Sequence, residues 1–127
     1  MAATAHPAPK SKATTHPVWL PAQRTSFLID SVGGVRRLAE ILSVSASQPS
    51  RWRSGAERPG PVASRRLLDL DHVFARALLL WEEPVARDWL ESPNGFLDGA
   101  RPIDVLRARG ASTVIDALDA AQSGAYA

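Results

Sequence analysis

Residues 89–127 decide how this chain folds, and their sequence is WLESPNGFLDGARPIDVLRARGASTVIDALDAAQSGAYA. Proline and glycine divide this stretch, because Pro93-Asn94-Gly95 and Asp98-Gly99 are typical turn sequences. Residues that precede a proline avoid the helical region of backbone conformation. A helix that contains Trp89 and Leu90 is therefore predicted to end where the first of these turns begins.

Two short helices are predicted after the turns. Proline is favoured in the first turn of a helix and glycine just beyond its end, so Pro102 and Gly110 bound the first of them. The second is expected from about Ser112 to Gln122. Beyond Asp119, the last charged residue, the chain offers only small side chains, one amide and Tyr126. The chain therefore ends in a small, uncharged tail.

A long apolar helix is predicted before this stretch, from Val62 to about Trp81. Its apolar side chains recur every three or four residues in two adjacent stripes, so the helix must be buried on two sides. One side can cover the N-terminal helices, and the other needs the C-terminal helices, a second copy of the chain, or both. The stripes are Leu67, Leu70, Phe74, Leu78 and Trp81, and Leu68, Val73, Ala77 and Leu80.

Three shorter helices are predicted on the N-terminal side of the long one. The first is expected to begin at the possible caps Thr25 or Ser26 and to stop at Gly33-Gly34. The second is amphipathic and follows at once, from Val35 to Leu42. The fold class is therefore predicted to be all-α.

The third helix is predicted to begin at Ala46, because Ser45 and Gln48 have the spacing of a capping box, and to end near Ser54-Gly55. Two short helices joined by a tight turn have the geometry of a helix-turn-helix, whose second helix enters the major groove of DNA. We expect a homodimer through the long apolar helix, whose second side needs a cover, and two-fold symmetry also suits palindromic operators. The polar side chains predicted to contact bases and phosphates are Ser47, Gln48, Ser50, Arg51 and Arg53.

Two other residues of this third helix are predicted to affect its packing. Trp52 is expected to anchor the helix in the core rather than to stack on a base. Pro49 comes early enough to remove only a hydrogen bond at the end of the first turn, so the helix survives. The proline nevertheless puts the packing and docking angle of the helix in question.

Charge is distributed unevenly along the chain, although its net charge is only +2. Residues 1–66 contain ten Lys and Arg against three Asp and Glu, whereas residues 67–127 contain five against ten. A basic half suits a polyanion such as DNA, and an acidic half suits a different partner. The alternative is that ordinary solvated faces happen to segregate along the chain.

Composition excludes several classes of protein. The absence of cysteine removes disulfides and thiolate chemistry, and agrees with a cytoplasmic location. The longest apolar run, residues 77–81, is far shorter than the roughly 20 residues that a membrane span needs. There is no glycine-rich phosphate loop or nucleophile elbow, and His72 beside Asp71 is more typical of a surface residue than of a general base. We therefore expect no enzyme, no bound metal and no cofactor.

The chain is about one domain in length, and we divide it into four segments. Residues 1–20 contain few large apolar residues and are expected to form a disordered tail. Residues 21–61 form the helix-turn-helix, residues 62–83 the long central helix, and residues 84–127 a small C-terminal helical module with its tail.

Both halves resemble one family of regulators. The stretch LAEILSVSASQPSRWRSG, residues 38–55, is similar to the Xre-type helix-turn-helix, although Pro49 stands where that type usually has an apolar residue. The C-terminal module follows the pattern Trp89-Leu90-x-Ser92-Pro93-Asn94-x-x-Leu97-x-x-x-x-Pro102-x-Asp104-x-Leu106, then Gly110, Val114 and Leu118. This pattern resembles the toxin-binding domain of the MbcA/ParS/Xre antitoxins.

The resemblance implies a type II toxin–antitoxin function. In this family the partner is a RES-domain toxin that destroys NAD, and the C-terminus of the antitoxin enters the active-site cleft of the toxin. The residues that would contact the toxin here are Gln122, Ser123, Gly124, Ala125, Tyr126 and Ala127. Without the resemblance, the same residues would be interpreted as a frayed terminus.

Two functions follow from these patterns. The first is an antitoxin that neutralises a RES-domain toxin through its C-terminus and binds its own operator through the helix-turn-helix. The second is a stand-alone helix-turn-helix repressor, whose C-terminal helices serve only for dimerisation or for sensing a ligand. The presence or absence of a RES-domain reading frame beside the gene would distinguish them.

Overall fold

The structure, a computed structural model, describes residues 21–124 of the 127 in the chain. Within this range it contains α-helices, one short 3₁₀ helix and no strand, which confirms the predicted all-α class. None of these helices has the length and apolar character needed to cross a membrane. The elements are α2 (Ala22–Val32), α3 (Val35–Leu42), α4 (Gln48–Ser54), α5 (Pro61–Ala77), α6 (Glu83–Glu91), η1 (Gly95–Leu97), α7 (Pro102–Arg109) and α8 (Ala111–Gln122).

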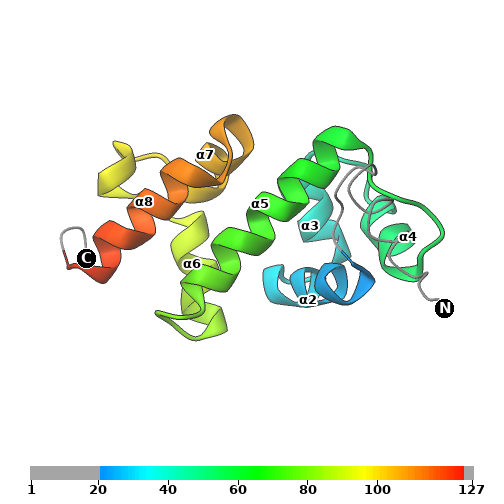
Figure 1. Ribbon diagram of the computed structural model, residues 1–127, viewed down its shortest axis with the longest axis horizontal. Helices are drawn as coiled ribbons and strands as arrows, with labels where there is room; N and C mark the ends of the chain where they lie inside the picture. Colours follow the sequence, from blue (N-terminus) through cyan, green and yellow to red (C-terminus); the bar gives the residue numbers. More distant parts are fainter. Residues whose placement is uncertain (1–20, 125–127) are drawn as a thin grey trace, which may run out of the picture.

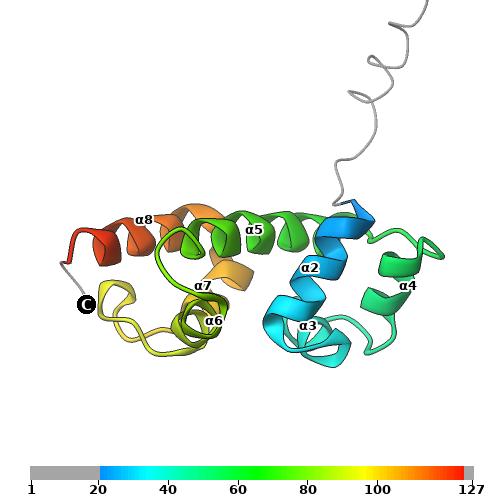
Figure 2. The same ribbon diagram turned by 90° about the horizontal axis from the view of Figure 1, so that it is seen from below.

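Helix α5 runs along the middle of the molecule and joins two groups of helices (Figure 1). Helices α2, α3 and α4 lie around its first half, and α6, α7 and α8 lie around its second half (Figures 1 and 2). Helix α4 and the C-terminal end of α8 therefore stand at opposite ends of an elongated molecule.

The two-sided burial predicted for the long helix is confirmed. Leu67, Leu70 and Phe74 have no exposed surface, and neither have Val73 and Ala77 of the second stripe. The chain itself supplies the cover, because α5 contacts α2 and α3 in one group and α7 and α8 in the other. One continuous hydrophobic core thus extends through both groups of helices.

The long helix ends at Ala77, so its predicted extension to about Trp81 is wrong. The chain leaves the helix in a turn, where the amide of Leu79 bonds to the carbonyl of Arg76 and the amide of Trp81 bonds to the carbonyl of Ala77. The turn reverses the chain before Pro84, which stands in the first turn of α6. The apolar spacing of the helix continues as far as Trp81 in the sequence. Trp81 lies outside the helix but is also half-buried against the core.

The first helix begins at Ala22, three and four residues before Thr25 and Ser26, the possible caps that the sequence indicated. Pro21 precedes the helix, and its carbonyl accepts hydrogen bonds from the amide and the hydroxyl of Thr25, at 3.0 and 3.2 Å. Thr25 is therefore a buried residue of the first turn rather than a cap. Helix α3 has the predicted bounds, and Gly33 and Gly34 between α2 and α3 both adopt positive φ.

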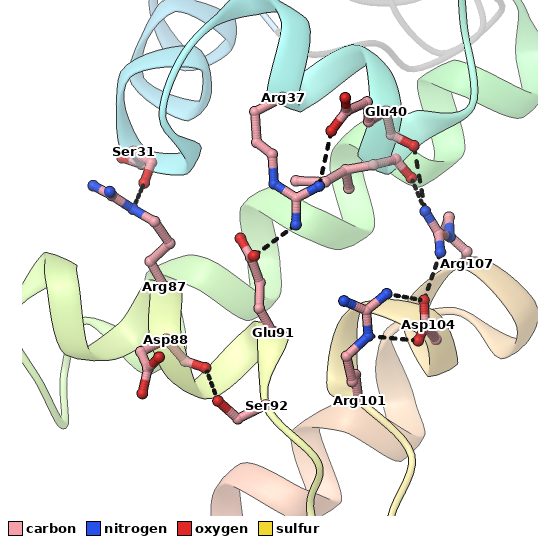
Figure 3. A network of polar contacts seen from close by, with 11 residues as sticks. Ser31, Arg37, Glu40, Arg87, Asp88, Glu91, Ser92, Arg101, Asp104 and Arg107 are labelled. Carbon is pink, nitrogen blue, oxygen red and sulfur yellow. Dashed lines mark hydrogen bonds and ion pairs between the residues drawn. The ribbon is translucent and has the colours of Figure 1, made fainter.

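Polar contacts fix the orientation of the two groups of helices (Figure 3). Arg37 of α3 forms an ion pair of 2.6 Å with Glu91 of α6, which raises the pKa of the Arg37 guanidinium. The carbonyl of Ser31, at the end of α2, accepts a hydrogen bond of 2.8 Å from Arg87 of α6. The hydroxyl of Ser31 donates in turn to Glu83 at 3.0 Å.

Two arginines from other helices donate hydrogen bonds to the carbonyls at the C-terminal end of α3. The last carbonyls of a helix have no partner within the helix. Here Arg107 of α7 donates to the carbonyls of Glu40 and Ile41, at 3.3 and 3.4 Å, and Arg66 of α5 donates to that of Leu42 at 3.1 Å. The C-terminal group thereby holds the helix that precedes the turn into α4.

We predict that Arg107→Met lowers the free energy of unfolding by about 1 kcal/mol, because two carbonyls of α3 lose their charged donor. Urea denaturation, followed by circular dichroism, measures this change. Arg109→Met is the control, since Arg109 is exposed on the same helix and its loss should change stability by less than about 0.5 kcal/mol. Equal effects of the two substitutions would contradict the capping role of Arg107.

Candidate functional sites at the two ends of the molecule

Helix α4 packs on α2 and α3 in the arrangement of a helix-turn-helix. It begins at Gln48 rather than at Ala46, because Pro49 has no amide hydrogen to bond to the carbonyl of Ser45. The capping interaction is half formed: the amide of Ser45 donates to Oε1 of Gln48 at 3.0 Å, but no hydroxyl caps the helix. Pro49 and Trp52 are both buried, so the proline fills the apolar position and the predicted core role of Trp52 is confirmed.

The five side chains predicted to contact DNA lie on α4 and the residue before it, but they differ in their surroundings. Ser50 and Arg53 are exposed. Arg51 forms a bond of 2.7 Å with Glu57 and one of 2.8 Å with the hydroxyl of Ser47. Gln48 also donates to Glu57, at 3.1 Å. Three of the five side chains are therefore joined to one another and to a carboxylate.

Glu57 is the residue of this surface that sequence reasoning missed. The hydrogen bond from Arg51, followed by that from Gln48, holds the pKa of the Glu57 carboxyl below its usual range. The only signal in the sequence was a single acid between Arg53 and Arg58, and it did not indicate which side chains would fold back onto it. The contacts hold the Arg51 guanidinium in one orientation on the surface.

The other end of the molecule is formed by the end of α8. Val114, Ala117 and Leu118 are buried and fix this helix on the core. An ion pair of 2.8 Å between Arg76 and Asp119 adds a link to α5. Of the predicted toxin-contacting residues, Gln122, Ser123 and Gly124 are exposed, whereas Ala125, Tyr126 and Ala127 lie outside the described residues.

The turn at Ser92-Pro93-Asn94 has the structural role expected from the sequence. Asn94 is buried, and its side chain accepts a hydrogen bond of 2.9 Å from the amide of Phe96. Its backbone closes the loop, since its amide bonds to the carbonyl of Ala100 and its carbonyl accepts from Gly99. The loop thus positions η1 and the start of α7 beside α8.

A cavity of about 510 Å³ lies between this loop, α6 and the end of α8, and Trp81 and Trp89 form part of its wall. A larger cavity of about 850 Å³ lies between α5 and the start of α8 and includes His72. The carboxylate of the neighbouring Asp71 forms an ion pair of 2.7 Å with Arg24. No cluster of His, Asp and Glu with metal-binding geometry occurs within residues 21–124.

The second group of helices matches a known family. The model of the antitoxin Xre/MbcA/ParS C-terminal toxin-binding domain covers residues 75–124, from the end of α5 through α8. Residues 75–124 are therefore similar to the Xre/MbcA/ParS-type toxin-binding domain. This match confirms the resemblance that was inferred from the motif between Trp89 and Leu118.

Relatives match a longer part of the chain. The mycobacterial cidal antitoxin MbcA of Mycobacterium bovis and that of Mycobacterium tuberculosis are each 26% identical over 106 residues, which is 83% of this chain and 94% of theirs. The crystal structure of the M. tuberculosis MbcT–MbcA toxin–antitoxin complex contains a chain with 25% identity and a TM-score of 0.71. That match covers 84% of this chain and 96% of the other, so the likeness to the MbcA antitoxins extends to both groups of helices.

We predict that Glu57→Gln changes how stability depends on pH. Because the folded-state pKa of Glu57 is lowered, its ionised carboxylate stabilises the fold at neutral pH, and this contribution is lost as the pH falls through the lowered pKa. The melting temperature of the variant should therefore be below that of the wild type at pH 7, and the two should converge in acid. A gap that stays constant down to strongly acidic pH would contradict the ion pair with Arg51.

Proposed function

We propose that the protein is the antitoxin of a type II toxin–antitoxin pair, and that it neutralises a RES-domain, NAD-degrading toxin. The match of residues 75–124 to a toxin-binding domain carries this proposal. The likeness to a chain in the MbcT–MbcA complex supports it. In this function the protein performs no catalysis of its own and acts in the cytoplasm by occupying the active site of its partner.

The inhibitory segment is Gln122 to Ala127, which follows the last charged residue of the chain. Small residues such as Ser123 and Gly124 fit a narrow cleft, and Tyr126 supplies a single aromatic anchor. The terminal carboxylate can meet cationic groups that otherwise bind the pyrophosphate of the dinucleotide.

Helix α8 is a suitable support for such a segment. Three buried side chains and the Arg76–Asp119 ion pair fix the helix up to one turn before its end. A segment that leaves a fixed helix loses less conformational freedom on binding than one that leaves a mobile loop. Rigid attachment therefore increases the affinity of the tail for the toxin.

Operator binding is the second part of the proposal. It assigns DNA contacts to Ser47, Gln48, Ser50, Arg51 and Arg53, in a homodimer that binds a palindromic site. The position of α4 supports this assignment, since it lies at the opposite end of the molecule from the end of α8 (Figure 1). DNA bound at one end leaves the other end open to the toxin. A stand-alone repressor, the alternative, would bind its operator without a toxin encoded beside it.

The tail is tested by removing residues 124–127, which lie beyond the last buried side chain of α8, Leu118. We expect the truncated protein to keep its fold and its DNA binding but to lose at least 100-fold in affinity for the toxin, roughly 3 kcal/mol. Co-expression with the adjacent RES-domain reading frame, followed by growth and cellular NAD, measures neutralisation. Full protection by the truncated protein would refute the insertion of the tail.

The DNA-binding surface is tested with Arg53→Ala, because Arg53 is exposed on α4. Loss of one arginine that contacts a base is expected to weaken operator binding by about 1–3 kcal/mol. Gel-shift titration at several salt concentrations measures the loss and distinguishes base contacts from phosphate contacts. Arg109→Ala is the matched control, since Arg109 lies on α7, outside the helix-turn-helix. If the wild type and Arg53→Ala bound the operator with equal affinity, Arg53 would not be part of the DNA interface.

A further inference from the structure

The cavity beside the end of α8 has an aromatic wall. Trp81 and Trp89 are half-buried, and their rings lie 5.6 Å apart between centroids at an angle of 35°. Ala121, in the last turn of α8, lines the same cavity. The surface therefore begins within one helical turn of the proposed inhibitory tail.

The same cavity is lined by an acidic residue that forms no ion pair within the described part of the chain. Asp88 lines it and is exposed, and its carboxylate has no ion-pair partner within residues 21–124. In Figure 3 only the backbone carbonyl of Asp88 carries a contact, which it accepts from the hydroxyl of Ser92 at 2.7 Å. The neighbouring acids Glu83 and Glu91 are paired with Arg87 and Arg37. The exposed carboxylate of Asp88 is therefore accessible to a cation from outside the chain.

The surface continues along one face of α6. Val85 lies one helical turn before Trp89, and 51% of it is exposed, which is unusual for a large apolar residue. Asp88 and Ser92 lie on the same face at helical spacing. Apolar surface, aromatic rings and an unpaired carboxylate are thus combined in one place.

We propose that this surface is a second toxin contact and that its cavity receives an arginine or lysine side chain of the toxin. The inference rests on the proposed antitoxin function. Aromatic rings attract a cation over their faces, and a carboxylate beside them neutralises its charge. Charge complementarity therefore favours a basic side chain over an acidic or aliphatic one. The tail enters the active site, and this contact holds the rim of the toxin beside it.

The experiment measures the affinity of the full-length antitoxin for a catalytically inactive form of the RES-domain protein encoded beside its gene. Asp88→Asn is expected to weaken binding about 5- to 10-fold, and Asp88→Arg at least 50-fold, because the reversed charge repels the cation. The Asp88→Asn complex should also show a weaker dependence of affinity on salt. Trp81→Leu should weaken binding as well, through loss of the aromatic face.

Asp116→Arg is the matched control, since Asp116 is exposed on α8 and lines the other cavity. Circular dichroism verifies that each variant is folded, which is expected for Asp88 because its side chain is exposed. Unchanged affinity of both Asp88 variants, with the truncated tail still impaired, would overturn the second contact and leave the antitoxin function intact. Failure of the wild-type protein to bind the toxin would overturn both.

Discussion

The burial of α5 on two sides is the constraint on which the rest of the structure depends. Each fully buried leucine or phenylalanine on this helix contributes roughly 1.5–3 kcal/mol, whereas an exposed ion pair contributes about 0–1 kcal/mol. Leu67, Leu70 and Phe74 therefore hold the two groups of helices on one core, and the ion pairs cannot do so alone. The ion pairs instead select one orientation of the groups, because Arg37 and Arg107 reach specific partners across the boundary.

Much of this architecture was predictable from apolar spacing and from proline and glycine. The bounds of α3 and α7, the buried stripes of α5 and the turn at Asn94 all follow from local patterns, which record the periodicity and termini of helices. The errors occurred where a contact distant in sequence decides the structure. Trp81 continues the apolar spacing of α5 but packs against Trp89 after a turn, and spacing alone cannot distinguish these positions.

The polar surface of α4 was predictable in composition but not in its contacts. The sequence placed Ser47, Gln48 and Arg51 on one surface, yet their bonds to Glu57 depend on the path of the loop after the helix. The loop after the helix, residues 55–60, has no periodicity from which its path can be inferred. The sequence likewise contained Asp88 and the two tryptophans, but their shared cavity exists only because α6, η1 and α8 pack together.

The segregation of charge along the chain has an internal use as well as the external one inferred from the sequence. Arginines of the basic half pair with acids of the acidic half, as in Arg24–Asp71 and Arg37–Glu91, so part of the asymmetry is neutralised within the fold. Exposed charges without an ion-pair partner remain at both ends of the molecule. Within residues 21–124, Arg53 on α4 and Asp88 on α6 have no ion-pair partner and are exposed. An unpaired charge can bind a partner without first breaking an internal ion pair. Arg53 therefore favours a negatively charged partner and Asp88 a positively charged one.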